Sequence, residues 1–242
     1  MKDPNILRVQ SKREAKQRIS ESFWTTFAAG ALYIMPVFAL TMMTMLLPVV
    51  LKEYPIWMDA FLYLAELLVV SPLAFGFGLY CVARARGIEA PFYTVFEPLG
   101  SARGYMRAIA ISVSIALRLL PITAVRLLLI YTVPVESVVY PIADVLIGLG
   151  TVLEMVLHLA MTACYNFILD DPSIGSWRAV RQARDLYAGY VFQLLAFIFS
   201  FVGWIFLSVF SMGLLLPYLA AYQNIAFARM TDLLREPESI IE

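Results

Sequence analysis

The chain has 242 residues, of which 61% are hydrophobic and 15% charged, with a mean hydropathy of +0.78 and a formal net charge of zero. Soluble domains carry about 25% charged and 45–50% apolar residues, so this composition excludes an ordinary soluble globule. The 18 basic and 18 acidic residues create no overall positive field that would favour nucleic acid. Two cysteines, Cys81 and Cys164, are too few for a disulfide framework.

The apolar residues are concentrated in six segments, and about 20 residues are enough for a helix to cross the hydrocarbon of a bilayer. The predicted spans cover residues 27–50, 56–83, 106–130, 138–168, 191–210 and 214–230. The sixth is interrupted by Gln223, Asn224 and Arg229, so a re-entrant or interfacial helix is the alternative there. We expect an all-α integral membrane protein in which residues 1–242 form a single membrane domain, a bundle of six transmembrane helices.

Lys and Arg residues alternate between the segments that flank these spans. From the N-terminus to the C-terminus the segments contain 6, 1, 4, 0, 3, 0 and 2 of them. Loops rich in Lys and Arg stay in the cytoplasm, so the alternation predicts that both termini are cytoplasmic. Five spans would instead place Arg229 and Arg235 outside, which favours the sixth span.

Polar segments on the predicted cytoplasmic side show helical periodicity. In residues 169–190, Trp177, Val180, Ala183 and Tyr187 recur every three or four positions, as in an amphipathic helix. The charged residues of this segment are Asp170, Asp171, Arg178, Arg181 and Arg184. The helix is predicted to lie at the membrane surface, where each arginine would gain about 1 kcal/mol from anionic headgroups. A plain loop whose charges only set the orientation is an equal alternative.

Two further segments fit the same description. Residues 1–26 are predicted to form a cytoplasmic amphipathic helix with Ala15, Ile19 and Phe23 on one face. Residues 91–107 are a third and shorter candidate, broken by Pro98 and Gly100.

The stretch YNFILDDPSIGSWRAVRQARDLYAGYVFQLLAFIFSFVGWIFLSVFSMGLLLPY resembles a family of small polytopic bacterial membrane proteins known as domain of unknown function 975. The residues that fit the family's pattern are Tyr165, Asp170, Pro172, Gly189, Phe201, Gly203, Trp204, Gly213, Pro217 and Tyr218. REAKQRISESFW is similar to the family's opening helix, so the resemblance covers the last third and the N-terminal helix. It implies a multi-pass protein of the bacterial cytoplasmic (inner) membrane, and it implies no activity.

Ionisable residues occur inside the predicted spans, where they persist mainly when they are paired or face a cavity. They are Asp59, Glu66, Arg118, Arg126, Asp144, Glu154 and His158. Helical rise places Arg118 and Glu154 at about 18 Å from the cytoplasmic ends of their spans, and Arg126 and Asp144 at about 30–33 Å. We therefore predict the pairs Arg118–Glu154 and Arg126–Asp144, with Glu66 between the two levels.

Glu154 and His158 lie four residues apart and so share one helix face. They would line a polar cavity for a charged ligand or a proton path, with His158 as the titrating group. The simpler interpretation, which we favour, is that the charges in the spans fix the contacts between helices.

No catalytic motif is present. HExxH, GxSxG and a P-loop are missing, one His with one Glu is too few for a metal site, and Asp170–Asp171 lacks companion ligands. We expect no enzyme, no cofactor and no metal. Gly76 and Gly78 are predicted to permit close helix contacts.

The sequence therefore favours a non-enzymatic accessory or scaffold protein that acts on membrane lipids or on a partner membrane protein. The alternative is a small transporter or ligand-binding membrane protein with its cavity around Glu154 and His158.

Overall fold

Every regular element is helical in residues 4–50, 56–133, 137 and 140–236, the part of the chain that the computed structural model describes. This confirms the all-α fold class. The elements are α1 (Pro4–Glu21), α2 (Phe23–Val50), α3 (Ile56–Ala65), the π-helix η1 (Glu66–Val70), α4 (Ser71–Ala85), the 3₁₀-helix η2 (Phe92–Gly100), α5 (Ala102–Thr132), α6 (Tyr140–Thr162), α7 (Cys164–Asp170), α8 (Ser176–Tyr187), α9 (Val191–Phe199), α10 (Val202–Phe210) and α11 (Leu216–Arg235).

Five helical stretches of the described chain are long and apolar enough to cross a membrane. They are Phe23–Leu47, Phe61–Ala85, Ala102–Thr132, Tyr140–Asp170 and Val191–Phe210, and they overlap the first five predicted segments. The sixth predicted segment is not confirmed as a span. It falls in α11, where Asn224, Arg229 and Asp232 lower the hydropathy and ten of the twenty residues are buried against other helices.

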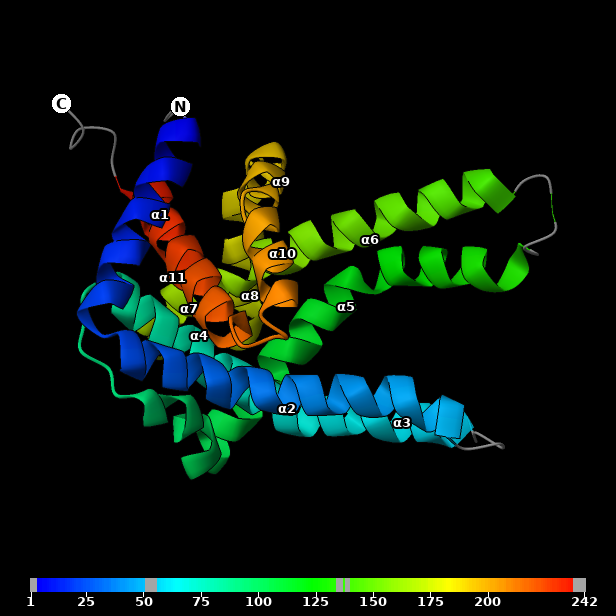
Figure 1. Ribbon diagram of the computed structural model, residues 1–242, viewed down its shortest axis with the longest axis horizontal. Helices are drawn as coiled ribbons and strands as arrows, with labels where there is room; N and C mark the ends of the chain where they lie inside the picture. The colour runs from blue at the N-terminus through cyan, green and yellow to red at the C-terminus, as the bar shows by residue number, and fades with distance from the viewer. Residues whose placement is uncertain (1–3, 51–55, 134–136, 138–139, 237–242) are drawn as a thin grey trace.

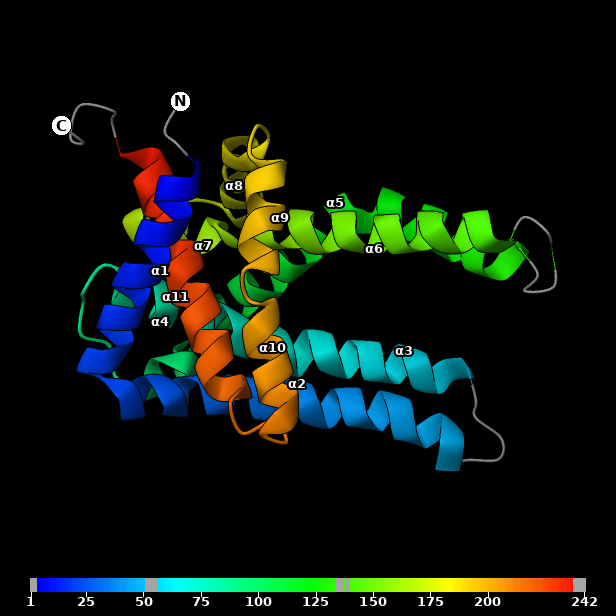
Figure 2. The ribbon, with the colours of Figure 1, turned by 45° about the horizontal axis from the view of Figure 1, so that its top comes forward.

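Two antiparallel helix hairpins project side by side from a helical body (Figures 1 and 2). One consists of α2 with the continuous run α3–η1–α4, and the other of α5 with α6. Large apolar side chains are exposed along both, as expected of surfaces in contact with hydrocarbon. The body contains α1, α7, α8 and α11, and α9 with α10 runs across the direction of the hairpins.

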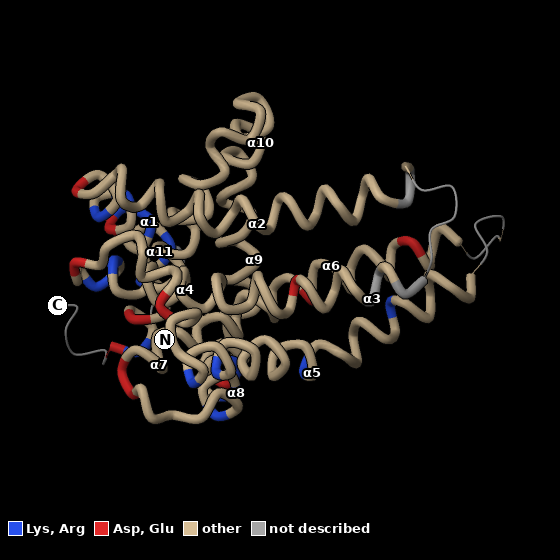
Figure 3. Tube along the Cα trace, turned by 90° about the horizontal axis from the view of Figure 1, so that it is seen from below, with Lys and Arg blue, Asp and Glu red and all other residues tan. Residues whose placement is uncertain are grey.

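The charged residues are gathered at one end of the molecule. Figure 3 shows most Lys, Arg, Asp and Glu residues in the body, with few along the hairpins. Helix α1 and the C-terminal end of α11 lie at this body end, away from the hairpin tips (Figure 1). The charged helices α1, α8 and α11 therefore lie on one side of the molecule.

Helix α1 packs against α11 through a stripe of buried residues spaced four apart: Leu7, Ser11, Ala15 and Ile19. The predicted burial of Ala15 and Ile19 on one face is thus confirmed. The predicted third member, Phe23, is 41% exposed because the chain turns at Ser22 and Phe23 begins α2.

Helix α8 has one buried apolar face, and that face contacts protein. Val180 and Ala183 are buried and α8 packs on α5, α6 and α7, while the buried Tyr187 stacks on Phe227 and shares a hydrogen bond with Thr231, both of α11. Trp177, predicted on the same face, is 54% exposed. The prediction that this face lies on the membrane surface is not confirmed, because neighbouring helices already bury it.

Glycines at helix contacts allow backbones to approach closely. A Cβ atom on Gly76 would lie 2.1 Å from the Val95 carbonyl oxygen in η2, and one on Gly78 would lie 2.2 Å from the Tyr165 ring in α7. The prediction for both glycines is confirmed. Gly30 likewise allows α2 to approach α11 closely, because a Cβ atom on Gly30 would lie 2.1 Å from the Pro217 carbonyl oxygen.

Candidate functional site

The charges in the second hairpin form a different pair from those predicted. Arg126 Nη2 lies 3.2 Å from Glu154 Oε2, Thr123 Oγ1 donates to Glu154 Oε1 at 2.7 Å, and Arg126 Nη1 donates to Thr151 Oγ1 at 3.2 Å. The Arg126 and Glu154 side chains are 26% and 22% exposed. Polar and charged groups from α5 and α6 therefore contact one another inside a candidate span, although Arg126 Nε and Glu154 Oε2 are buried without a hydrogen bond.

The direction of the side chains explains the shifted register. Cα–Cβ bonds in a helix tilt toward its N-terminus. In antiparallel helices Arg126 therefore extends toward the body, whereas Glu154 extends toward the hairpin tip. Helical rise alone places the backbones of Arg126 and Glu154 at different depths, but the two side chains extend toward each other and meet. The predicted pairs Arg118–Glu154 and Arg126–Asp144 therefore do not form.

The other predicted members of this cluster lie apart from it. Asp144 and His158 are both exposed, and neither makes a hydrogen bond or an ion pair within the described residues. Neither Glu154 nor His158 lines the pocket beside Glu66, the small pocket beside Tyr165 or the basin beside Arg86. The side chain of Asp59 lies outside the part of the chain that is described.

Arginines of α5 hold the segment between α7 and α8 through backbone carbonyls. Arg107 donates to the carbonyl oxygens of Pro172 and Ile174, both at 2.7 Å, and Arg118 donates to that of Trp177 at 3.1 Å. Within this segment Asp171 Oδ1 accepts bonds from the backbone N–H and the hydroxyl of Ser173. Asp171 thus stabilises a turn that precedes α8, which begins five residues later at Ser176.

A basic surface lies where α8 meets α5; we define it as Arg118, Trp177, Arg181 and Arg184. The Arg118 guanidinium stacks on the Trp177 ring at 3.6 Å, and Arg181 and Arg184 share one partner, Asp185, at 3.7 and 2.7 Å. The hydrogen bond from Arg184 lowers the pKa of Asp185, which therefore stays ionised. Arg178 is also exposed on α8. Three guanidinium groups with one carboxylate leave this surface net positive.

A second charged group was missed by the sequence reasoning. Arg86 after α4 donates to both Asp232 carboxylate oxygens at 2.9 and 2.8 Å and to Asp170 Oδ1 at 2.5 Å. Arg235 reaches Asp170 Oδ2 at 2.7 Å, and Asn166 donates to Asp232 at 3.0 Å. The hydrogen bonds to Asp232 and then to Asp170 raise the pKa of Arg86. Counting Lys and Arg residues could not find this group, because the count gives the number of charges in each segment but does not show which acidic residues they pair with.

This second group borders an open basin of about 560 Å³ between the ends of α4, α7 and α11. Arg229 and Glu236 complete the lining, and Arg229 is paired with Glu14 of α1 and with Glu236. The charges are thus matched within the protein, so the group joins four helices instead of presenting free charge. In the described residues no three His, Cys, Asp or Glu side chains are grouped as a metal site.

The family model described as Protein of unknown function (DUF975) matches residues 7–230. The chain belongs to this family. The match extends well beyond the last third and the N-terminal helix, where the resemblance was recognised, and includes all five candidate spans. No curated protein and no solved structure matches the chain.

The DUF975 match includes the basic surface and, of the Arg86 group, Arg86, Asn166 and Asp170; Asp232 and Arg235 lie beyond its last matched residue. Of the two, the basic surface has the exposed and unbalanced charge that can bind an external anion. The Arg86 group and the Arg126–Glu154 pair are internally neutralised, which suits them to hold helices together.

Proposed function

We propose that the chain is a non-enzymatic accessory or scaffold protein of the bacterial cytoplasmic membrane that binds anionic lipid headgroups at the basic surface. In this proposal the body faces the cytoplasm and carries both termini. The single observation that carries it is the excess of guanidinium groups over carboxylates around an exposed tryptophan, because Trp and Arg together are typical of the lipid–water interface.

The proposed topology has three pairs of crossing segments. Two ends of the described chain on one side of a membrane require an even number of crossings, and α1 and the end of α11 lie at the body end (Figure 1). We propose α9–α10 and α11 as the fifth and sixth crossings; because α9 and α10 run across the hairpins in Figures 1 and 2, this topology requires them to turn toward the hairpin direction in a bilayer.

The location of the basic surface supports the lipid role. Trp177, Arg181 and Arg184 recur at positions i, i+4 and i+7, which places them on one side of α8, beside the buried Val180. Arg107 and Arg118 fix the helix to the first half of a candidate span. A headgroup phosphate there could accept bonds from two guanidinium groups at once.

The Glu154–His158 transporter is the less supported alternative. Glu154 is already neutralised by Arg126 and hydrogen bonded by Thr123, and neither Glu154 nor His158 lines a described cavity. A carboxylate engaged in this way is suited to fixing two helices together.

The proposal is tested by measuring lipid retention by native mass spectrometry on purified protein. The probes are phosphatidylglycerol and phosphatidylcholine, the variant is Arg181→Gln/Arg184→Gln, and the control is Arg13→Gln/Lys16→Gln on the exposed side of α1. At about 1 kcal/mol per arginine, the α8 variant should bind phosphatidylglycerol roughly 30-fold more weakly. Equal loss in both variants, or no preference of the wild type for the anionic lipid, would refute the proposal.

A further inference from the structure

Glu66 is a carboxylate in the middle of the first hairpin. It lies within the candidate span Phe61–Ala85, roughly 28 Å along the helix from Ala85 and about 15 Å from the start of α3 at Ile56. Its side chain is exposed, and its carboxylate makes no ion pair or hydrogen bond within the described residues. An ionised carboxylate in hydrocarbon is costly unless a positive charge accompanies it.

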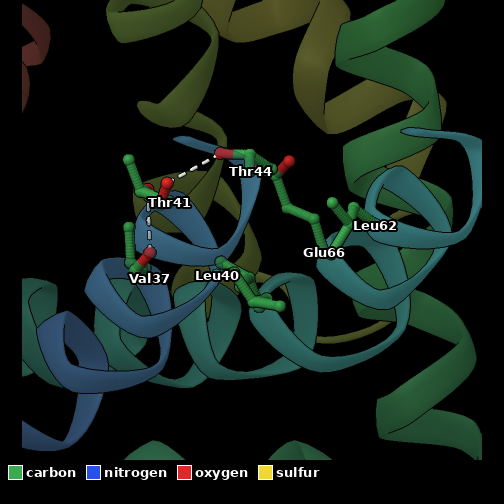
Figure 4. Close-up of a pocket in the computed structure, with 7 residues that line it drawn as sticks. Val37, Leu40, Thr41, Thr44, Leu62 and Glu66 are labelled. Atoms are coloured by element: carbon green, nitrogen blue, oxygen red, sulfur yellow. Dashed lines mark hydrogen bonds between the residues drawn. The ribbon is translucent and has the colours of Figure 1, made fainter. Parts of the chain in front are cut away.

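The Glu66 carboxylate borders a small pocket between α2 and the α3–η1 run. Figure 4 shows the Glu66 side chain extending toward Thr44 across the gap between the two helices. The pocket has a volume of about 60 Å³, and its lining consists of Val37, Leu40, Thr41, Thr44, Leu62, Glu66 and Val70. Liquid water occupies about 30 Å³ per molecule, so the pocket has room for a small ion with a water molecule.

The oxygen atoms of this pocket are acceptors. Thr41 Oγ1 donates its proton to the Val37 carbonyl at 2.9 Å, and Thr44 Oγ1 donates to the Thr41 carbonyl at 2.7 Å. Each hydroxyl then keeps only lone pairs for other partners. Together with the Glu66 carboxylate they form the all-oxygen, acceptor-only set that hard cations prefer.

The π-helix η1 begins at Glu66, and its backbone is satisfied without a ligand. The Ser71 N–H donates to the Glu66 carbonyl, and the Tyr105 hydroxyl donates to that of Leu68 at 3.0 Å. The titratable groups facing this segment are tyrosines, Tyr105 from α5 and Tyr33 from α2, which interacts electrostatically with Glu66. Neither supplies a positive charge.

The cationic side chains in the middle of the described spans are already engaged or lie at another depth. Arg126 is bound to Glu154, and Arg118 to Trp177. His158 lies roughly 18 Å from Asp170, about 10 Å nearer the charged end than Glu66. A second copy in the same orientation would therefore not bring His158 to Glu66, which leaves a small ion as the source of charge.

We propose that Glu66, Thr41 and Thr44 form an intramembrane site for a small monovalent cation, either a proton on the carboxylate or Na⁺ held by the three side chains. The site is independent of the basic surface and of the lipid role proposed for it.

The site is tested with dicyclohexylcarbodiimide, which modifies protonated carboxyl groups in apolar surroundings. The full-length protein is reconstituted in phosphatidylcholine vesicles, and the modified peptides are quantified by mass spectrometry. Glu154, paired with Arg126, and Asp144, near the hairpin tip, are internal controls. The reaction is run across a pH series, and with NaCl against choline chloride at equal ionic strength.

We expect Glu66 to react at least tenfold faster than either control and to be protected in one of two ways. Protection by rising pH alone identifies a proton as the occupant, whereas additional protection by Na⁺ but not choline identifies the alkali ion. For Na⁺, the isosteric variant Thr44→Val should raise the concentration that gives half protection at least tenfold, and Thr44→Ser should restore it.

Three results would overturn the site. Glu66 could react no faster than Asp144, or react at a rate that neither pH nor Na⁺ changes. It could also react in purified protein but be shielded in native membranes, which would mean that a partner protein covers it. The comparison of the three carboxylates is made within the wild-type chain, so a variant that fails to fold cannot obscure it.

Discussion

Replacement of Gly76 by alanine should destabilise the protein, because the added methyl group meets backbone. Its Cβ would lie 2.1 Å from the Val95 carbonyl oxygen, 2.7 Å from the Val95 carbonyl carbon and 3.0 Å from Pro98 Cδ. An ordinary contact is about 3.5 Å, so η2 would have to move by roughly 1.4 Å. Val95 is fully buried, and α4 and η2 are in extensive contact, which opposes that movement.

The magnitude follows from two opposing terms. Overpacking of this kind costs about 1–3 kcal/mol, whereas alanine in a helix is favoured over glycine by about 0.5–1 kcal/mol. The central values of the two terms leave a net loss of about 1.3 kcal/mol, and a chain of this size shifts its melting temperature by about 2–4 °C per kcal/mol. We therefore expect a fall of roughly 3–5 °C.

The assay is thermal unfolding of the purified protein in detergent, with Gly148→Ala as the matched control. Gly148 is also in a helix within a candidate span, but a Cβ there would meet nothing within 4 Å. That variant should melt at or slightly above the wild-type temperature. If Gly76→Ala were as stable as Gly148→Ala, the close approach of α4 and η2 would not be as described.

Three other predictions follow from contacts of single residues. In a double-mutant cycle, Arg126→Gln and Glu154→Gln should show a coupling energy of about 0.6–1.7 kcal/mol by thermal unfolding, and additive effects would contradict the pair. Arg107→Gln should make trypsin cleavage in α8 at least about tenfold faster, since hydrogen bonds from a charged donor contribute about 1.5 kcal/mol each and the shorter glutamine can lose one or both of the two bonds. An unchanged rate would contradict the anchoring role. A membrane-impermeant maleimide should label Ser137→Cys on intact cells, and Ser173→Cys only after the cells are permeabilised. Background labelling should be low because both native cysteines are buried. The reverse labelling pattern would invert the proposed orientation.

The sequence predicted helices and buried faces better than it predicted their partners. Periodicity identified Val180, Ala183 and Tyr187 as one apolar face, because a side chain's position around a helix depends only on its own helix. What covers that face depends on α5, α6, α7 and α11, which no local pattern encodes. Trp177, predicted on the same face, stays exposed, and the Arg118 guanidinium stacks on its ring.

The candidate sites show a similar division. Intramembrane charges were identified from residue type and depth, but the pairing of Arg126 with Glu154 depends on side-chain direction as well as helical rise. The Arg86, Asp170 and Asp232 group joins residues far apart in the chain. The Glu66 pocket depends on the local π-helix and on the alignment of α2 with α3, neither of which has a sequence signal.

The contact between α1 and α11 has a consequence for how the protein is made. Helix α1 is synthesised before α11, yet the stripe from Leu7 to Ile19 is covered by α11. During translation the two hairpins can enter the membrane in turn, while the apolar stripe of α1 stays uncovered until α11 emerges from the ribosome. A chain truncated before α11 would keep that stripe bare, which offers chaperones and proteases a marker of an unfinished protein.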